Sequence, residues 1–125
     1  MVRMACVLFA DDDADIRALA TQLLSQRGYE VVTAGDGAEA IDMLAPLAPD
    51  MVVTDLIMPR SSGHDVCTAV RRIPKLLTIP LVLFTAVPLT DERVRRVTAD
   101  TNAIALTKTD IGRLPDLADE LVNAA

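Results

Sequence analysis

A short apolar run in the middle of the chain, Met51 to Thr54, ends in the carboxylate of Asp55 and is soon followed by Pro59. Apolar runs of this length are typical of strands that are buried on both faces of a parallel sheet. The side chain that follows such a strand lies at the sheet edge where open α/β folds bind their ligands. Asp55 is therefore either a reactive group at that edge or the cap of the next turn, which is a common role of Asp.

Four more stretches have the length and composition of strands, and helical periodicity separates them. The expected strands are Met4 to Ala10, Tyr29 to Ala34, Met51 to Thr54, Ile79 to Thr85 and Ala103 to Thr107. The expected helices contain the apolar series Ile16 to Leu24, Ile41 to Ala45, Val66 to Ile73, Val94 to Val97 and Leu114 to Val122. Five strands that alternate with five helices predict a single α/β domain, in which a parallel sheet has helices on both faces.

Capping residues, glycines and prolines are expected to set the ends of the helices. They are Gly28 after the first helix, the capping box Asp36 and Glu39 before the second, Pro46 and Pro49 at its end, Thr90 before the fourth, and Pro115 in the first turn of a short fifth helix. The fourth helix has a narrow apolar face, made by Val94 and Val97. After Asp55, Pro59 turns the chain away from the strand, and Gly63 is expected to take a positive φ.

The composition argues against several classes of function. The net charge of −6 argues against a general nucleic-acid binder, because such proteins use Lys and Arg to neutralise phosphates. The chain shows neither a signal-peptide pattern nor an apolar run long enough to cross a bilayer, so we expect a cytoplasmic protein without membrane contact. Cys6 and Cys67 lack metal-ligand spacing and a CxxC motif, which predicts two buried free thiols.

Polar residues follow four of the expected strands, and the carboxyl ends of parallel strands open at one edge of a sheet. These residues are Asp11 and Asp12 after the first strand, Asp55 after the third, Thr85 at the end of the fourth and Lys108 after the fifth. Three carboxylates in one crevice repel one another, which raises at least one carboxyl pKa or requires a cation. Mg²⁺ suits such a crevice because it prefers oxygen ligands, including one or two carboxylates.

The chain is similar over its whole length, residues 1–125, to the receiver domain of two-component response regulators. The segments that carry the resemblance are Ala10 to Arg17, Asp55 to Pro59 with Gly63, Phe84 to Ala86, and Leu106 to Lys108. The resemblance implies a flavodoxin-like (βα)5 doubly wound sheet with strand order 2-1-3-4-5. It also implies a signalling phosphoprotein that catalyses its own phosphorylation and slow dephosphorylation and is not otherwise an enzyme.

The resemblance also implies a role for each residue at the sheet edge. Asp55 would accept a phosphoryl group from the phosphohistidine of a histidine kinase or phosphotransfer protein, and a downstream protein target would read the change. Mg²⁺ would be held by Asp12, Asp55 and the backbone carbonyl of Ile57, while Asp11 acts largely through water. The groups that would contact the phosphoryl oxygens are the Lys108 ammonium, the Thr85 hydroxyl and the backbone N–H groups of Ile57 and Ala86.

The chain departs from the receiver pattern around Lys108. Receivers usually have a proline after the lysine, in a cis peptide, and this chain has Thr109. A cis bond before a residue other than proline costs about 3 kcal/mol, so we expect a trans Lys108–Thr109 bond. We also expect a looser or redirected loop, which puts in doubt whether Lys108 reaches the carboxylates. Ala105 stands where receivers usually have an aromatic residue that changes rotamer on phosphorylation. We therefore hypothesise that signalling depends on a shift of the segment Val87 to Ala99.

The lifetime of the phosphorylated state depends on two positions beside the expected site. Ile57 and Val87 lie two residues beyond Asp55 and Thr85, and both are apolar. Neither side chain can orient an attacking water molecule, which predicts slow hydrolysis. His64 is expected to be an exposed polar residue of a helix, in preference to a relay for the phosphoryl group.

Two other functions remain open. A pseudo-receiver would have the same fold and bind proteins without regulation by phosphorylation, and Thr109 and Ala105 favour it. A small hydrolase would use the same carboxylates on a separate substrate, but the sequence offers no obvious substrate pocket or general acid. A stand-alone receiver is the leading interpretation, because residues 1–125 contain no sign of a DNA-binding or enzymatic output domain.

Overall fold

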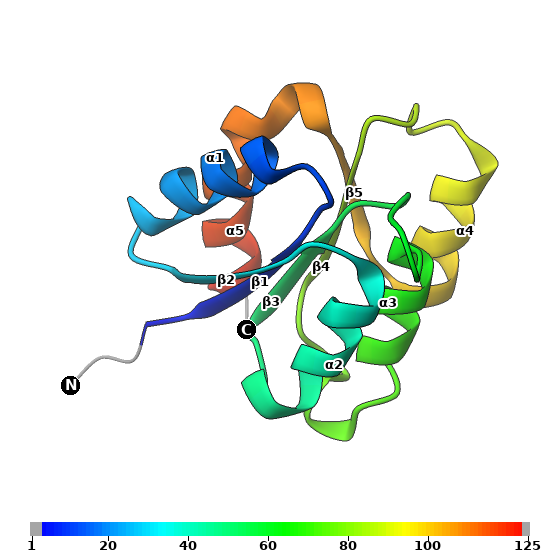
Figure 1. Cartoon of the computed structure of the whole chain (residues 1–125), viewed down its shortest axis with the longest axis horizontal. Coiled ribbons are helices and arrows are strands. Elements are labelled where there is room, and N and C mark those ends of the chain that lie inside the picture. The colour runs from blue at the N-terminus through cyan, green and yellow to red at the C-terminus, as the bar shows by residue number, and fades with distance from the viewer. Residues whose placement is uncertain (1–3, 124–125) are drawn as a thin grey trace.

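Five parallel strands form one sheet in the order β2-β1-β3-β4-β5 in the computed structural model, which describes residues 4–123 (Figure 1). The strands are β1 (Cys6–Ala10), β2 (Glu30–Ala34), β3 (Met51–Thr54), β4 (Leu81–Thr85) and β5 (Ile104–Thr107). The expected strand order is confirmed. The first strand is shorter than expected, because its pairing with β2 begins at Cys6 and Glu30, and Met4 is exposed.

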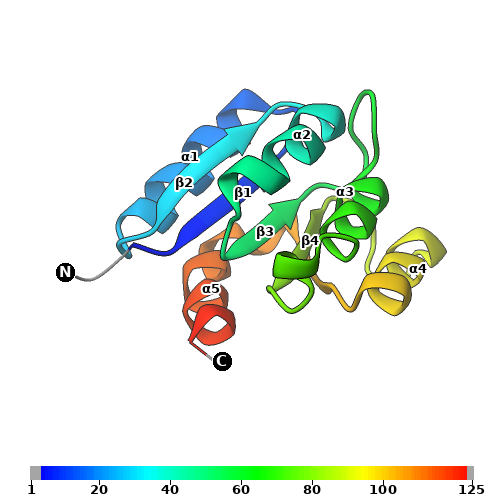
Figure 2. The same ribbon diagram turned by 90° about the horizontal axis from the view of Figure 1, so that it is seen from below.

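Helices cover both faces of the sheet, as the alternating pattern predicts. They are α1 (Ala14–Ser25), α2 (Gly37–Leu47), α3 (Gly63–Val70), α4 (Glu92–Thr101) and α5 (Leu114–Val122), with short 3₁₀ helices at Pro74–Leu76 and Lys108–Arg113. Figure 2 shows α1 and α5 on one side of the sheet and α2, α3 and α4 on the other. Within residues 4–123, no helix has both the length and the apolar composition that crossing a membrane requires.

The strands are buried on both faces because each face packs against a different group of helices. Successive residues of a strand point to opposite faces. Val52 therefore belongs to the core beneath α2, α3 and α4, and Val53 to the core beneath α1 and α5. In the second core the rings of Phe9 and Phe84 pack with centroids 5.9 Å apart. Every residue of β3 is buried, as the central apolar run predicts.

The ends of α2 differ from the expected pattern. Asp36 caps the helix by accepting a hydrogen bond of 2.8 Å from the Glu39 N–H group, but the Glu39 carboxylate accepts from Gly35 N–H at 3.3 Å, so the box is not reciprocal. Pro46 does not end the helix, which continues to Leu47. Pro46 has no N–H to donate to the Asp42 carbonyl, but the last turn still closes, because Ala48 N–H donates to the Leu44 carbonyl at 2.9 Å.

The start of α4 is also shifted by one residue. Thr90 is not its cap: the Asp91 carboxylate accepts the capping hydrogen bond, at 2.8 Å from Arg93 N–H. Two good capping residues are adjacent here, and Asp is the stronger N-cap of the two. Val94 and Val97 are buried, so the narrow apolar face is sufficient to hold this helix on the sheet.

Two other expectations are confirmed. Helix α5 is short and has Pro115 in its first turn. Cys6 and Cys67 are both buried, the Cys67 thiol is not in a disulfide, and burial raises its pKa to about 12. A thiol with so high a pKa is not a nucleophile near neutral pH.

Arg71, at the carboxyl end of α3, ties three backbone segments together. Its Nε donates to the Thr101 carbonyl at 2.8 Å, and its Nη1 donates to the carbonyls of Leu77 and Ile79 at 3.0 and 2.8 Å. These carbonyls belong to the end of α4 and to the connection between α3 and β4. The guanidinium thus satisfies the carbonyl of the last residue of α4 and two carbonyls in the connection that leads to β4.

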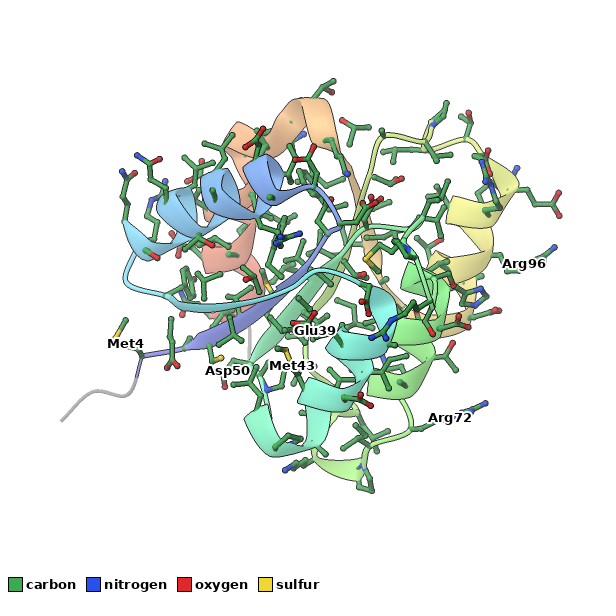
Figure 3. The ribbon with its side chains drawn as sticks, viewed as in Figure 1. Met4, Glu39, Met43, Asp50, Arg72 and Arg96 are labelled. Carbon is green, nitrogen blue, oxygen red and sulfur yellow. The ribbon has the colours of Figure 1, made fainter. Side chains whose placement is uncertain are left out.

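Replacement of Arg71 by Ala is expected to lower the free energy of unfolding by about 2 kcal/mol, because partly buried carbonyls lose charged hydrogen-bond donors. The matched control is Arg72→Ala, since Arg72 is exposed and points away from the domain (Figure 3). That change should stay within about 0.5 kcal/mol. Urea unfolding followed by circular dichroism measures both, and equal effects of the two variants would contradict the role of Arg71.

Candidate functional site

Polar residues from four strand ends meet at one edge of the sheet. Asp11 and Asp12 follow β1, and Asp55 follows β3. One carboxylate oxygen from each of these residues lies within 4.8 Å of the others. Asp11 is fully buried and Asp55 is 7% exposed, whereas Asp12 is exposed. The sheet thus brings together the three carboxylates that the sequence predicts.

The ammonium group of Lys108 joins two of these carboxylates. Lys108 Nζ lies 2.8 Å from Asp11 Oδ2 and 2.9 Å from Asp55 Oδ2. Burial lowers the pKa of Lys108, but attraction to the two carboxylates outweighs burial and raises the pKa above its ordinary value. The lysine therefore stays charged, and it neutralises one of the three negative charges.

Asp11 remains the least satisfied member of the cluster. Its Oδ1 accepts from Asp13 N–H at 2.9 Å, but its buried Oδ2 has no hydrogen bond of good geometry within the described part of the chain, although Lys108 lies close. Burial raises the pKa of the Asp11 carboxyl, and Lys108 offsets only part of this effect. An orphaned buried oxygen in an all-oxygen cluster fits a hard divalent cation such as Mg²⁺.

Asp55 is held in place from both sides of its carboxylate. Oδ1 accepts from Leu56 N–H at 2.7 Å, and Oδ2 accepts from Lys108. The backbone is fixed too, since Asp55 N–H donates to the Ala10 carbonyl at 2.9 Å and the Thr54 hydroxyl donates to the Asp55 carbonyl at 2.9 Å. The cap of a turn and a preorganised reactive group both need such contacts, and Asp55 is in addition buried beside the Lys108 ammonium.

Gly63 supports the loop after Asp55 in a way that the sequence did not reveal. Its φ is not positive, so the conformational reason expected for this glycine is wrong. The requirement is space: a Cβ atom at Gly63 would collide with the carbonyl oxygen of Asp55. Gly63 N–H also donates to the Leu56 carbonyl at 2.8 Å, which closes the loop against the strand end.

Thr85 lies at the same edge but makes a different contact. It is 1% exposed, and its hydroxyl oxygen accepts a hydrogen bond of 3.1 Å from Val87 N–H. Ala86 and Ile57 are exposed on the loops beside the carboxylates, and the side chain of Ile57 is 55% exposed. Their positions leave the loop backbone open to a ligand above Asp55.

The loop that carries Lys108 is ordered by hydroxyl groups. The Lys108–Thr109 peptide is trans, as expected, but the loop is not loose or redirected. Residues Lys108–Arg113 form 3₁₀ turns with a kink at Asp110, and the lysine reaches the carboxylates. Thr107 Oγ1 lies 3.0 Å from Thr109 Oγ1 and donates to Asp110 Oδ2 at 3.2 Å. The chain is thereby fastened on both sides of Lys108.

Sequence reasoning missed these supporting residues, together with Arg17. The spacing of Thr107 and Asp110 has the form of a helix-capping signature, so it could have been noticed. Arg17 Nη1 donates to the Asp11 carbonyl at 2.7 Å from helix α1. An arginine in the first turns of a helix gives no sequence signal of such a contact.

Comparison with known proteins agrees with this geometry. The family model of the response regulator receiver domain matches residues 7–117. The response regulator MprA of Mycobacterium avium is 40% identical over 88 residues, which are 70% of this chain and 38% of that protein. The probable transcriptional regulator ycf27 of Guillardia theta is 41% identical over 80 residues, which are 64% of this chain and 30% of that protein. The chain thus spans about a third of the length of these two relatives.

Solved structures give the same result over a larger share of the chain. The chemotaxis protein CheY4 of Vibrio cholerae superposes with a TM-score of 0.85 and 28% identity, and the match covers 95% of this chain and 99% of that one. The fold is accordingly flavodoxin-like, in a single domain. Because the family model matches most of its length, this chain belongs to the response regulator receiver domain family.

Proposed function

We propose that this receiver accepts a phosphoryl group on Asp55 from the phosphohistidine of a histidine kinase or phosphotransfer protein, and signals through contacts with a downstream protein in the cytoplasm. The observation that carries the proposal is the position of Asp55. Its carboxylate is buried at the end of β3, 2.9 Å from the Lys108 ammonium and within the cluster of Asp11 and Asp12. Receivers of this family are signalling modules of two-component systems.

The phosphoryl transfer needs little from the protein beyond the alignment of the reacting atoms and positive charge near the phosphoryl oxygens. One Asp55 oxygen forms a bond to phosphorus while the P–N bond breaks, and the imidazole nitrogen of the donor takes the electron pair. Phosphoryl transfer depends mainly on positioning and on neutralising the equatorial oxygens. The Leu56 N–H group orients the carboxylate, and the Lys108 ammonium is already within reach of the incoming oxygens.

The remaining contacts come from the residues around Asp55. Asp12, Asp55 and the Ile57 carbonyl would hold Mg²⁺, with Asp11 acting largely through water; when bound, the ion supplies positive charge to the phosphoryl oxygens. The Thr85 hydroxyl and the N–H groups of Ile57 and Ala86 would donate to those oxygens. The orphaned Oδ2 of Asp11 supports a cation site, because it is a buried acceptor without a well-directed donor in the described chain.

The geometry weakens the case for a pseudo-receiver. Thr109 and Ala105 favoured that alternative. Thr109 no longer supports it, because Lys108 lies within hydrogen-bond distance of Asp55 through a trans Lys108–Thr109 peptide. Ala105 remains a departure from the usual pattern. It affects the signalling step after phosphorylation and leaves the acceptor side of the site intact.

Phosphorylation can be tested directly. The protein is incubated with Mg²⁺ and acetyl phosphate, and intact mass spectrometry is expected to show one added phosphoryl group. Asp55→Asn should abolish the addition, because the amide is a poor nucleophile, and Asp42→Asn should retain it, since Asp42 is exposed on α2. No addition to the wild-type protein would support the pseudo-receiver, and continuous consumption of donor would support a hydrolase.

The lifetime of the phosphoprotein gives a second test. Ile57→Asn is expected to shorten the half-life roughly tenfold, because an amide at this exposed position can orient an attacking water molecule. An amide does not take up the proton of the water, so this factor is smaller than the rate gain that general acid–base groups usually give. Ile57→Val keeps the position apolar and should leave the half-life unchanged. Loss of the added mass over time measures both, and equal lifetimes of wild type and Ile57→Asn would contradict the role of this position.

The path of the signal gives a third test. If the Thr85 hydroxyl turns to the phosphoryl group, Val87 N–H loses its 3.1 Å acceptor, and the segment 87–99 is expected to shift. Amide NMR spectra recorded with and without phosphorylation should change across this segment in wild type and in Thr85→Ser. The change should be much smaller in Thr85→Val, which lacks the hydroxyl. Unchanged spectra across the segment in the phosphorylated wild type would rule out this path.

A further inference from the structure

A pocket lies beside Asp55, between the loop that follows β3 and helix α4. Its volume is about 300 Å³, which is the lower end of the range for ligand pockets. The residues that form it include Leu56, Ile57 and Met58 from the loop, His64 from α3, and Arg93 and Arg96 from α4. The loop gives an apolar floor, and the helices give basic walls.

The apolar floor is incompletely covered. Ile57 is 55% exposed, which makes it one of the few large apolar side chains on the described surface. Met58 is half-buried and packs against the core beneath α2, α3 and α4. An apolar group placed here would remove the exposed surface of Ile57 from water, which favours binding.

The basic walls carry charges that are available to a partner. Arg93 pairs with Asp91 at 3.1 Å, and Arg96 pairs with Glu92 at 3.4 Å; the two arginine side chains are 59% and 63% exposed. Figure 3 shows Arg96 extending from α4 away from the domain. Exposed ion pairs of this kind contribute little to stability, so a carboxylate of a partner can replace them at small cost.

The width of the pocket is fixed by a contact between its two helices. His64 Nε2 of α3 lies 3.0 Å from Asp100 Oδ2 of α4. The contact joins the two walls, so the pocket exists before a ligand arrives. A preformed site saves the ordering cost of binding.

We infer that this pocket binds a short segment of a partner protein in which an apolar side chain lies next to a carboxylate. The apolar side chain covers Ile57 and Met58, and the carboxylate meets Arg93 and Arg96. Charge complementarity selects this ligand, because the exposed guanidinium groups of Arg93 and Arg96 line the pocket, and a carboxylate of the ligand can take the place of Asp91 or Glu92 in pairing with them.

The position of the pocket connects it to the phosphoacceptor. Leu56 forms part of its floor, and the N–H group of the same residue donates to Asp55 Oδ1 at 2.7 Å. A segment bound here thus contacts the residue that orients the acceptor carboxylate. The binding itself does not depend on phosphorylation, so the inference stands or falls separately from the proposed function.

The test uses the whole unphosphorylated protein and two acetylated, amidated tetrapeptides, Asp-Leu-Phe-Asp and its neutral counterpart Asn-Leu-Phe-Asn. Titration of the acidic peptide is expected to give saturable NMR shifts at Ile57, Met58 and His64. The neutral peptide should bind about fivefold more weakly, which is the upper end of what one exposed charge pair contributes. The double variant Arg93→Ala, Arg96→Ala should weaken the acidic peptide to the same extent.

The matched control is Arg95→Ala, since Arg95 is an exposed arginine of the same helix that does not line this pocket. This variant should bind the acidic peptide as wild type does. Equal binding of the two peptides, shifts confined to other surfaces, or an absence of saturable shifts would overturn the inference. Concentration-dependent shifts of the same residues without peptide would show that a second copy of this chain is the ligand, and would overturn it as well.

Discussion

The contact of one ammonium group with two buried carboxylates determines how this receiver is built. Lys108 lies within 2.9 Å of both Asp11 and Asp55, at the edge where β1, β3 and β5 end. Removing charges from water is costly, and a buried pair is tolerated only when geometry and further hydrogen bonds compensate. The third carboxylate, Asp12, stays exposed, so the cluster remains negative and ready for a cation. The sheet thus holds the lysine and the three carboxylates together, although they come from segments that are far apart in the sequence.

Close packing of loops on the strand ends keeps this arrangement in place. A Cβ atom at Gly63 would collide with the Asp55 carbonyl, and one at Gly37 would collide with the Ser61 carbonyl. The two glycines let α2 and α3 approach the same loop from different directions. Since that loop carries the Ile57 backbone, the proposed metal and phosphoryl contacts would depend on helix packing as much as on the acidic residues. The packing of α2 and α3 on this loop is therefore needed both for the fold and for the geometry of the candidate site.

The sequence predicts the regular parts of the molecule better than the contacts between them. Strand positions follow from apolar runs of strand length, and the carboxylates follow from the ends of those runs. Thr90 and Asp91 are adjacent and both can cap a helix, so the sequence leaves the start of α4 uncertain by one residue, although Asp is the stronger N-cap. The space requirement of Gly63 and the reach of Lys108 depend on segments far apart in the chain. Such contacts appear only once the sheet is assembled.

The small side chain of Ala105 has a structural consequence for signalling. Ala105 pairs in register with Leu83, two residues before Thr85 on β4, so Ala105 and Thr85 face the same side of the sheet as α4. A methyl group cannot transmit a rotamer change. The Thr85 hydroxyl already accepts from Val87 N–H, at the start of the segment that leads to α4. The proposed transmission through this backbone contact would need no aromatic residue, and it would lead to the wall of the pocket that contains Arg93.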